Sequence, residues 1–281
     1  MEEEAPPAEP RSQRFVLWLH GLGDTGGANE PIAGYAFAGA RWAFPTAPTA
    51  PVSCNRGMLM PSWFDIHDTP ITSKSVRGEA DVLRAVESVH AMIDQEISAG
   101  TRPEDVFVFG LSQGGTHAQS PAGTTHHYVH CSLVYERAED EIACAGALSI
   151  ASVLLYPRTL GGCAVFSGFL PFGASFASMV TAEAKKTPVL WVHGRADFLV
   201  PIEAGKDGTK FLRGRLGMSC EFKVYDGLGH ELAPYELQYC ERWAAGGGGG
   251  SNDDPGTRSV DRGVPRSRRS CSCGFGFFSR S

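Results

Sequence analysis

The sequence predicts an α/β fold: a single domain whose mostly parallel sheet carries helices on both faces. Short apolar runs recur along the chain, and each has the length of a buried strand. Segments of helical periodicity separate these runs, and strands that alternate with helices indicate a parallel sheet covered on both sides. With 281 residues, 42 % of them hydrophobic and 20 % charged, the chain can form a globular core of its own.

The individual elements follow from these runs and periods. Strands are expected at residues 15–19, 41–44 (the weakest candidate), 106–110, 163–167, 189–193 and 221–225. Helices are expected at residues 76–97, 148–156, 203–216 and 235–243. The first helix is predicted to end at Gly100, because glycine commonly follows the last turn of a helix. The proline-rich stretch 45–51 is expected to close the weak second strand.

Composition limits the cellular setting and the classes of partner. The formal net charge of −6 argues against a nucleic-acid-binding protein, whose surface would normally be basic. Residues 1–12 form an acidic, proline-rich leader without the features of a signal peptide, and we expect this leader to be disordered. No stretch approaches the ~20 apolar residues that span a bilayer. The expected location is the cytoplasm, with the nucleus as an alternative.

The remaining compositional features are the cysteines and the C-terminal tail. The chain has 8 cysteines, and without a secretory signal we expect them to be reduced. Cys163 lies in an apolar run and is expected to pack as a small hydrophobic residue. Residues 246–281 open with consecutive glycines and continue with polar and basic residues, which is typical of a disordered, low-complexity tail.

A candidate nucleophile follows the strand expected at 106–110. Residues 110–114 read Gly-Leu-Ser-Gln-Gly and match the pattern G-x-S-x-G. The pattern alone is a weak signal, and an ordinary glycine–serine turn would also produce it. Its position directly after a buried strand is where the nucleophile elbow of an α/β hydrolase lies. The sequence therefore predicts an α/β-hydrolase fold with Ser112 as the nucleophile.

The acid and the base are predicted from chain order. A serine becomes a nucleophile at neutral pH only when an imidazole, oriented by a carboxylate, accepts its proton. In this fold the order is Ser, then Asp, then His. Asp197 follows the strand expected at 189–193, and His230 follows the strand at 221–225. We therefore predict Ser112, Asp197 and His230 as a triad at the carboxyl edge of the sheet.

An oxyanion hole requires two backbone N–H donors. One is expected from Gln113, the residue after the nucleophile, and the other from the glycine-rich loop after the first strand, where Leu22 is the expected donor. The alternative for that loop is a plain glycine turn. His20 and His193 each end a buried strand, and we expect them to make structural hydrogen bonds rather than to act in catalysis.

Together, the motifs at residues 20–26, 60–65, 110–114, 193–197 and 227–230 resemble those of the acyl-protein thioesterase and lysophospholipase-like carboxylesterase family. The resemblance implies that Trp63 and Phe64 contact the acyl chain of the substrate. It further implies a cytosolic enzyme without a cofactor, acting on thioesters or oxyesters of fatty acyl groups. The expected substrates are acylated proteins, lysophospholipids or small esters, with at most transient membrane association; oligomeric state stays open.

The chain departs from the family pattern directly after the nucleophile. The buried helix that should follow the elbow resumes only at Gly146, so residues 116–145 form an atypical insertion in a domain spanning 13–245. One hypothesis is a retained intron, which gene and transcript sequences would test. The alternative is a tolerated loop, since long loops cost little closure entropy. His126, His127, His130 and Cys131 have no standard zinc spacing, so no metal is expected.

The sequence thus predicts a serine hydrolase that cleaves acyl thioesters or carboxylic esters through an acyl-enzyme. An insertion this close to the nucleophile puts activity in question, because a shift of about 1 Å can cost on the order of 100-fold in rate. The alternatives are a catalytically impaired hydrolase fold that binds ligands and a non-functional splice product.

Overall fold

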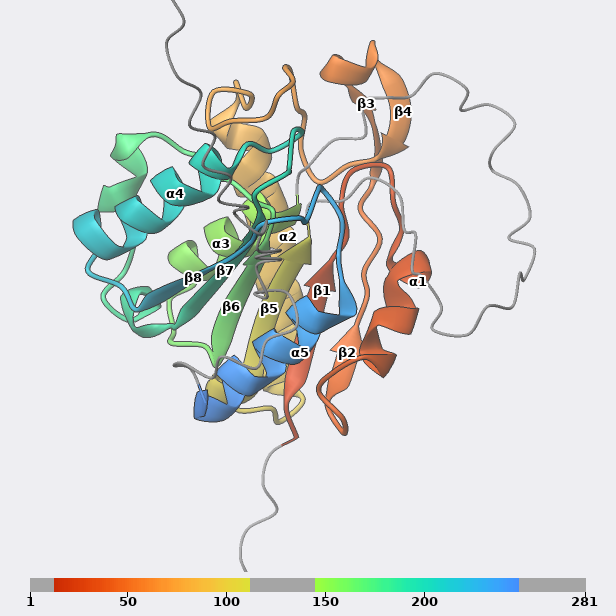
Figure 1. Ribbon diagram of the computed structural model, residues 1–281. Coiled ribbons are helices and arrows are strands. Elements are labelled where there is room, and N and C mark those ends of the chain that lie inside the picture. Colours follow the sequence, from red (N-terminus) through yellow and green to blue (C-terminus); the bar gives the residue numbers. More distant parts are fainter. Residues whose placement is uncertain (1–12, 112–144, 248–281) are drawn as a thin grey trace, which may run out of the picture.

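The computed structural model describes residues 13–111 and 145–247 (Figure 1). The predicted leader, nearly all of the predicted insertion 116–145 and nearly all of the tail 246–281 fall outside this part of the chain. Everything that follows on the fold refers to the described residues.

A six-stranded sheet forms the centre of the molecule, with the strand order β2-β1-β5-β6-β7-β8. Every neighbouring pair in this sheet is parallel. The strands are β1 (Phe15–Leu19), β2 (Arg41–Ala43), β5 (Val106–Leu111), β6 (Gly162–Phe166), β7 (Val189–Gly194) and β8 (Cys220–Tyr225). The parallel sheet and all six predicted strands are confirmed, with ends that differ by one residue.

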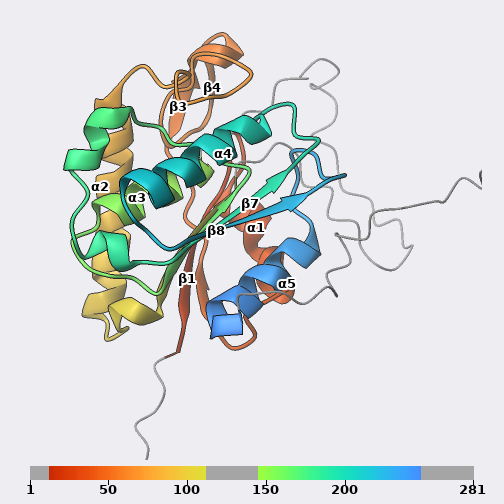
Figure 2. The same cartoon turned by 60° about the vertical axis from the view of Figure 1, so that its left-hand side comes forward.

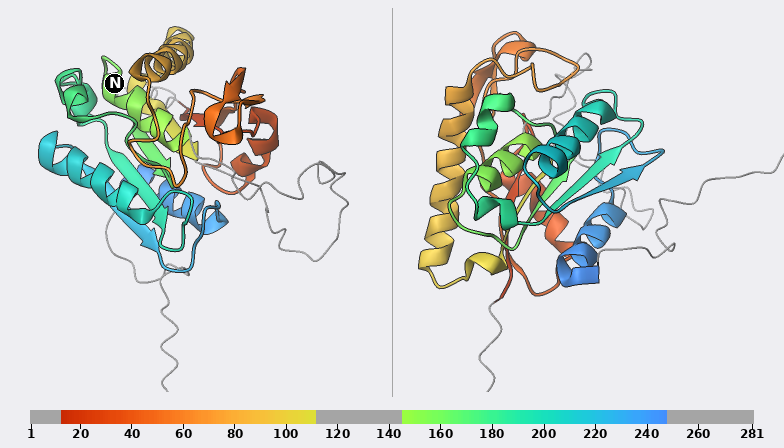
Figure 3. Two further views of the ribbon diagram at one scale, coloured as in Figure 1. Left: turned by 90° about the horizontal axis from the view of Figure 1, so that it is seen from above. Right: turned by 90° about the vertical axis from the view of Figure 1, so that its left-hand side faces the viewer.

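Helices cover both faces of this sheet, as predicted. Figures 2 and 3 show α2, α3 and α4 on one face and α1 and α5 on the other. The α-helices are α1 (Gly26–Asn29), α2 (Glu79–Ser98), α3 (Ala145–Leu155), α4 (Ile202–Lys210) and α5 (Pro234–Arg242). Shorter 3-10 and π turns are η1 (Glu30–Gly34), η2 (Ser53–Asn55), η3 (Pro103–Asp105), η4 (Ala174–Ser178), η5 (Ala184–Lys186), η6 (Phe211–Arg215) and η7 (Trp243–Gly247).

Three helix boundaries differ from the predictions by more than one residue. The predicted helix 203–216 is α-helical only to Lys210 and continues as the π turn η6. Helix α2 begins at Glu79 rather than at residue 76. Helix α3 begins at Ala145 rather than at residue 148, because the small residues Ala145 and Gly146 are already buried in its first turn.

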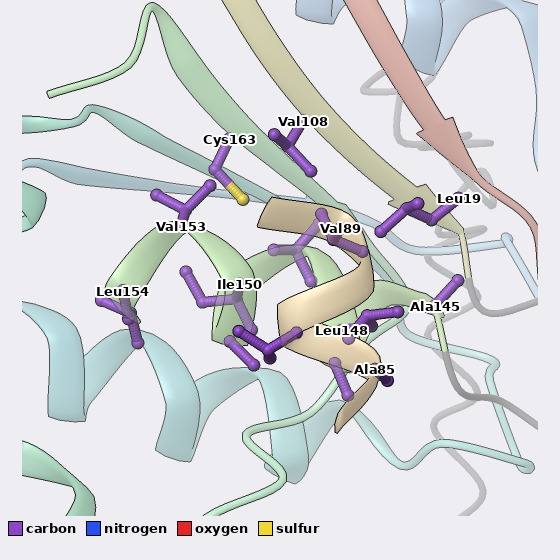
Figure 4. Close-up of a cluster of buried hydrophobic side chains, with 14 of the residues drawn as sticks. Leu19, Ala85, Val89, Val108, Ala145, Leu148, Ile150, Val153, Leu154 and Cys163 are labelled. Carbon is purple, nitrogen blue, oxygen red and sulfur yellow. The ribbon is translucent and has the colours of Figure 1, made fainter. Parts of the chain in front are cut away.

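The side chains of each strand alternate between two hydrophobic clusters. On one face Leu17, Val108 and Cys163 pack beneath α2 and α3, and Figure 4 shows Val108 and Cys163 close to Val89 of α2. On the other face Trp18 and Phe109 belong to the cluster that includes residues of η1 and α5. Cys163 is fully buried, which confirms its predicted role as a small hydrophobic residue.

An antiparallel hairpin, β3 (Thr49–Val52) with β4 (Met58–Pro61), stands beside the main sheet and was not predicted. Its prolines hide the strand pattern, since proline fits a strand only where its missing N–H is not needed. Arg56 and Gly57 turn the chain with φ of 56° and 77°. Gly23 N–H donates to Pro61 O at 2.9 Å, so the hairpin is fastened to the loop after β1.

Because the main strands are parallel, their carboxyl ends meet at one edge, and the loops after β1, β7 and β8 gather there. These loops carry Leu22, Asp197 and His230, and β5 ends at the same edge with Leu111, the residue before the predicted nucleophile Ser112.

Candidate active site

The loop after β7 holds the predicted acid, Asp197, in a fixed orientation. Asp197 Oδ1 accepts hydrogen bonds from the N–H of Leu199 at 3.0 Å and of Val200 at 2.8 Å. Aspartate favours such bonds to backbone N–H groups two and three residues ahead, which fold the loop into a tight turn around the carboxylate. Only 4 % of Asp197 is exposed, so the second oxygen, Oδ2, has a defined direction inside the protein.

That second oxygen meets the predicted base. His230 Nδ1 lies 2.7 Å from Asp197 Oδ2 and donates to it. A proton on Nδ1 leaves Nε2 of the neutral ring as an acceptor. His230 Nε2 is buried and has no hydrogen-bond partner within residues 13–111 and 145–247. The imidazole is therefore oriented to take a proton from a group outside this pair.

The electrostatics of the pair favour an ionised acid. Burial alone would raise the pKa of Asp197, but the hydrogen bond and charge of His230 and the N–H of Val200 outweigh it, so that the net pKa lies below its ordinary value. At neutral pH the carboxylate is charged and can stabilise an imidazolium on His230.

The acid loop and the base loop are joined through their backbones. Ala196 N–H donates to Leu228 O at 3.0 Å, and Arg195 N–H donates to Tyr225 O at 2.9 Å. A Cβ at Gly194 would lie 2.2 Å from Leu228 O, so only glycine permits this approach. The distance between Asp197 and His230 is thus set by the backbone of two neighbouring strands.

The strand that precedes the predicted nucleophile ends at this edge. Ser112 and Gln113 lie outside the described residues, so their roles stay predictions. Leu111, the residue before Ser112, ends β5, which pairs with β1 and β6 in the middle of the sheet. The register pairs Gly110 with Leu19, so β5 ends beside the loop after β1.

The start of α3 packs directly against the end of β5. A Cβ at Gly110 would lie 2.2 Å from Ala145 O and 2.8 Å from Ser149 Oγ, so glycine is required there. Gly146 likewise faces Gly168, where a Cβ would lie 2.9 Å from the Gly168 Cα. The described residues on either side of 112–144, at the end of β5 and the start of α3, therefore lie next to one another.

The loop after β1 contains the predicted oxyanion donor, Leu22, which is buried. His20 fixes this loop: its Nδ1 donates to Gly21 O at 2.6 Å, and its Nε2 accepts from Ala47 N–H at 2.9 Å. Burial lowers the pKa of His20, consistent with a neutral ring that accepts at one nitrogen. The predicted structural role of His20 is confirmed, whereas the role of Leu22 stays a prediction.

Trp63 and Phe64, the predicted acyl-contacting residues, adjoin the same loop. Trp63 Nε1 donates to His20 O at 3.0 Å, which places the indole next to the loop of Leu22. Trp63 and Phe64 are 8 % and 4 % exposed, and both belong to the core cluster beneath α2 and α3. Ser62 Oγ donates to Phe64 O at 2.7 Å and holds this segment in its turn.

Two buried polar residues, His193 and Glu236, were not predicted to be functional. His193 was excluded from catalysis, and its Nε2 indeed makes a structural hydrogen bond to Val200 O at 2.8 Å. Glu236, in the first turn of α5, accepts from Ala233 N–H at 2.7 Å and fixes the chain just after His230. The pattern Ala-Pro-x-Glu at 233–236, with an acidic residue three positions after a helix start, was the signal for it.

Neither a metal cluster nor a membrane-spanning helix occurs in the described part of the chain. Within residues 13–111 and 145–247, no group of three or more His, Cys, Asp or Glu side chains is arranged to hold a metal ion. His126, His127, His130 and Cys131 lie outside this part. None of the helices that the structure describes is long and apolar enough to cross a bilayer.

Comparison with known proteins places the chain in a family. The sequence profile of the phospholipase/carboxylesterase family matches residues 3–133 and 144–244. A protein of Oryza sativa subsp. japonica named a probable inactive carboxylesterase is 66 % identical over 267 residues, covering 93 % of this chain and 96 % of its own length.

Two further relatives carry the names of enzymes. The carboxylesterase SOBER1 of Arabidopsis thaliana is 47 % identical over 236 residues, 83 % of this chain and 90 % of that protein. Its crystal structure aligns with a TM-score of 0.69 over 83 % of this chain and 98 % of that chain. An acyl-protein thioesterase 1 of Gibberella zeae is 32 % identical over 258 residues, 84 % of this chain and 91 % of that protein. The chain therefore belongs to the phospholipase/carboxylesterase family of α/β hydrolases.

Proposed function

We propose that this chain is a serine hydrolase that cleaves acyl thioesters or carboxylic esters with Ser112, Asp197 and His230. The observation that carries the proposal is the hydrogen bond between His230 Nδ1 and Asp197 Oδ2, 2.7 Å long, at the edge of the sheet where β5 ends. It leaves His230 Nε2 as a buried acceptor without a partner in the described parts of the chain, and a serine hydroxyl is the group such an acceptor serves.

The mechanism consists of two acyl transfers. Ser112 Oγ attacks the substrate carbonyl while its proton passes to His230 Nε2, and Asp197 stabilises the imidazolium. The backbone N–H groups of Leu22 and Gln113 bind the oxyanion. When the intermediate collapses, His230 protonates the departing thiol or alcohol. Water, deprotonated by the same imidazole, then releases the carboxylic acid and restores Ser112.

The proposed substrates carry fatty acyl groups on a protein cysteine, a lysophospholipid or a small alcohol. The position of Trp63 supports this class, since its Nε1 donates to His20 O beside the loop of Leu22, and the family resemblance implies that Trp63 and Phe64 contact the acyl chain. Burial of each methylene contributes roughly 0.8 kcal/mol, so an acyl chain gains affinity from contact with apolar side chains. We propose action in the cytoplasm, without a cofactor, on acylated proteins or lipid esters, with at most transient contact with membranes.

Labelling with a fluorophosphonate tests the nucleophile. The purified full chain should become covalently labelled, and Ser112→Ala should abolish the labelling. Ser88→Ala provides the control, since Ser88 is an exposed residue of α2 whose hydroxyl only donates to Arg84 O. Labelling that persists in Ser112→Ala would assign the nucleophile to another residue.

A second function has specific support: an impaired hydrolase that binds acyl ligands without turning them over. The relative that is 66 % identical bears the name of a probable inactive carboxylesterase. In addition, α3 begins at Ala145 against Gly110, so the helix that should follow the elbow directly is reached only after the segment 112–144. Saturable binding of a fatty acid to a chain that releases no product from acyl esters would favour this function.

A further inference from the structure

His193, the next-to-last residue of β7, lies four residues before Asp197 and is completely buried. Its ring lies between the acid loop and α4, where a Cβ at Gly205 would come within 2.7 Å of His193 Nδ1. Such a position allows the ring very little movement.

One hydrogen bond of His193 acts on the loop that orients the acid. His193 Nε2–H donates to Val200 O at 2.8 Å. The N–H of the same residue, Val200, donates to Asp197 Oδ1, also at 2.8 Å. His193 and Asp197 thus hold the two ends of one residue, and a shift of Val200 would rotate the carboxylate.

The ring also lies near the oxygen that faces the base. His193 Nε2 is 3.7 Å from Asp197 Oδ2, the atom that accepts from His230. The proton that His193 Nε2 donates to Val200 O therefore also lies near the negative carboxylate. This arrangement stabilises the carboxylate orientation in which Asp197 Oδ2 faces His230.

The other nitrogen of the ring shows which tautomer is present. His193 Nδ1 is buried and has no hydrogen-bond partner in the described parts of the chain, so a proton there would be unsatisfied. Burial lowers the pKa of His193 and keeps the ring neutral, although Val200 O and Asp197 oppose this. The ring is thus fixed as the neutral Nε2–H form.

We propose that His193 is a positioning residue for the acid–base pair: its Nε2–H holds Val200 so that Asp197 presents Oδ2 to His230. This inference rests on the proposed function but concerns a different group. A merely structural role would require only the volume of the ring, whereas this role requires an N–H donor at the position of Nε2.

Three variants of the full chain separate the two roles. His193→Leu removes the donor and keeps most of the volume. His193→Gln keeps an N–H that reaches the position of Nε2, and His193→Asn carries an amide too short to reach Val200 O. The first readout is the downfield proton resonance of His230 Nδ1–H, assigned by its loss in His230→Asn. The second is the rate of fluorophosphonate labelling.

We expect His193→Leu and His193→Asn to lose or shift the resonance and to label about 100-fold more slowly, the cost of roughly 1 Å of misplacement. His193→Gln should stay near wild type in both readouts. If His193→Leu does not melt cooperatively, the comparison of His193→Asn with His193→Gln decides between the two roles. A folded His193→Leu or His193→Asn that keeps the wild-type resonance would overturn the proposal, as would a Gln variant that loses it. If Ser112 is not the nucleophile, labelling fails in every variant, but the resonance still tests His193.

Discussion

The acid–base pair and the junction of β5 with α3 lie at the same edge of the sheet but are built differently. Asp197 and His230 sit on short loops whose backbones are hydrogen-bonded to one another. At the junction, β5 and α3 touch at Gly110 and Ala145, yet the chain between them runs through residues 112–144. The proposed acid and base are therefore held by hydrogen-bonded backbone, whereas the proposed nucleophile, Ser112, belongs to the segment outside the described residues.

The largest effect on the labelling rate is expected at the acid–base pair. Asp197→Asn keeps an oxygen for the N–H groups of Leu199 and Val200 but turns an amide N–H toward His230. The imidazole then takes the wrong tautomer, and fluorophosphonate labelling should slow by about 10⁴-fold. Asp226→Asn is the matched control, since Asp226 is exposed and pairs with Arg195. A folded Asp197→Asn chain that labels within tenfold of wild type would show that the pair is not the acid and base.

A deletion at the junction of β5 with α3 should raise the labelling rate rather than lower it. Deleting residues 116–146 joins Gly115 to Ala147 and restores the sequence Ser-Gln-Gly-Gly-Ala-Leu after Leu111. We expect labelling and ester hydrolysis to rise by about 100-fold, because the N–H of Gln113 would return to the first turn of the helix. Equal or lower rates in a deletion variant that melts cooperatively would show that the segment does not impair the elbow.

A glycine substitution tests the contact between β5 and α3 itself. Gly110→Ala places a methyl group 2.2 Å from Ala145 O. Since this oxygen belongs to the backbone of α3, the contact can be relieved only if the helix moves. The free energy of unfolding in urea should fall by roughly 1–3 kcal/mol. Gly173→Ala serves as the control, because a Cβ at Gly173 meets no atom within 4 Å. If both variants lose equally little stability, α3 does not pack on β5 as described.

Glu236, just beyond the base loop, gives a prediction about the pH dependence of stability. Burial raises its pKa to about 8 from the ordinary 4.5. Between these values the folded state keeps a proton that the unfolded state releases, so the free energy of unfolding should fall as pH rises through this window. Glu236→Gln, which keeps an acceptor for Ala233 N–H, should lack that fall. The free energies of unfolding of the two proteins in urea should therefore diverge between about pH 5 and about pH 9. A constant difference over this range would contradict the prediction.

The sequence was sufficient for most of the sheet because its strands are buried on both faces and read as unbroken apolar runs. Val106–Leu111 and Val189–Gly194 could be recognised without any partner strand. The hairpin of β3 and β4 could not, since Pro51 and Pro61 remove donors and the alternation of side chains is weak. Helix α1 escaped prediction because Gly26–Asn29 is too short and glycine-rich to show a period.

For the site, Asp197 and His230 could be predicted from the sequence because each follows a strand in the chain order typical of this fold. The contribution of His193 could not be read in this way. It depends on a hydrogen bond to the carbonyl of Val200, and backbone carbonyls carry no sequence signal. Glu236 became informative only when its burial was known.

The most direct test of the account is a crystal structure of the chain after reaction with a fluorophosphonate. We predict the adduct on Ser112, with Oγ within about 3.5 Å of His230 Nε2 and Nδ1 still bonded to Asp197. An adduct on another residue, or a phosphonylated Ser112 far from His230, would contradict the proposed mechanism.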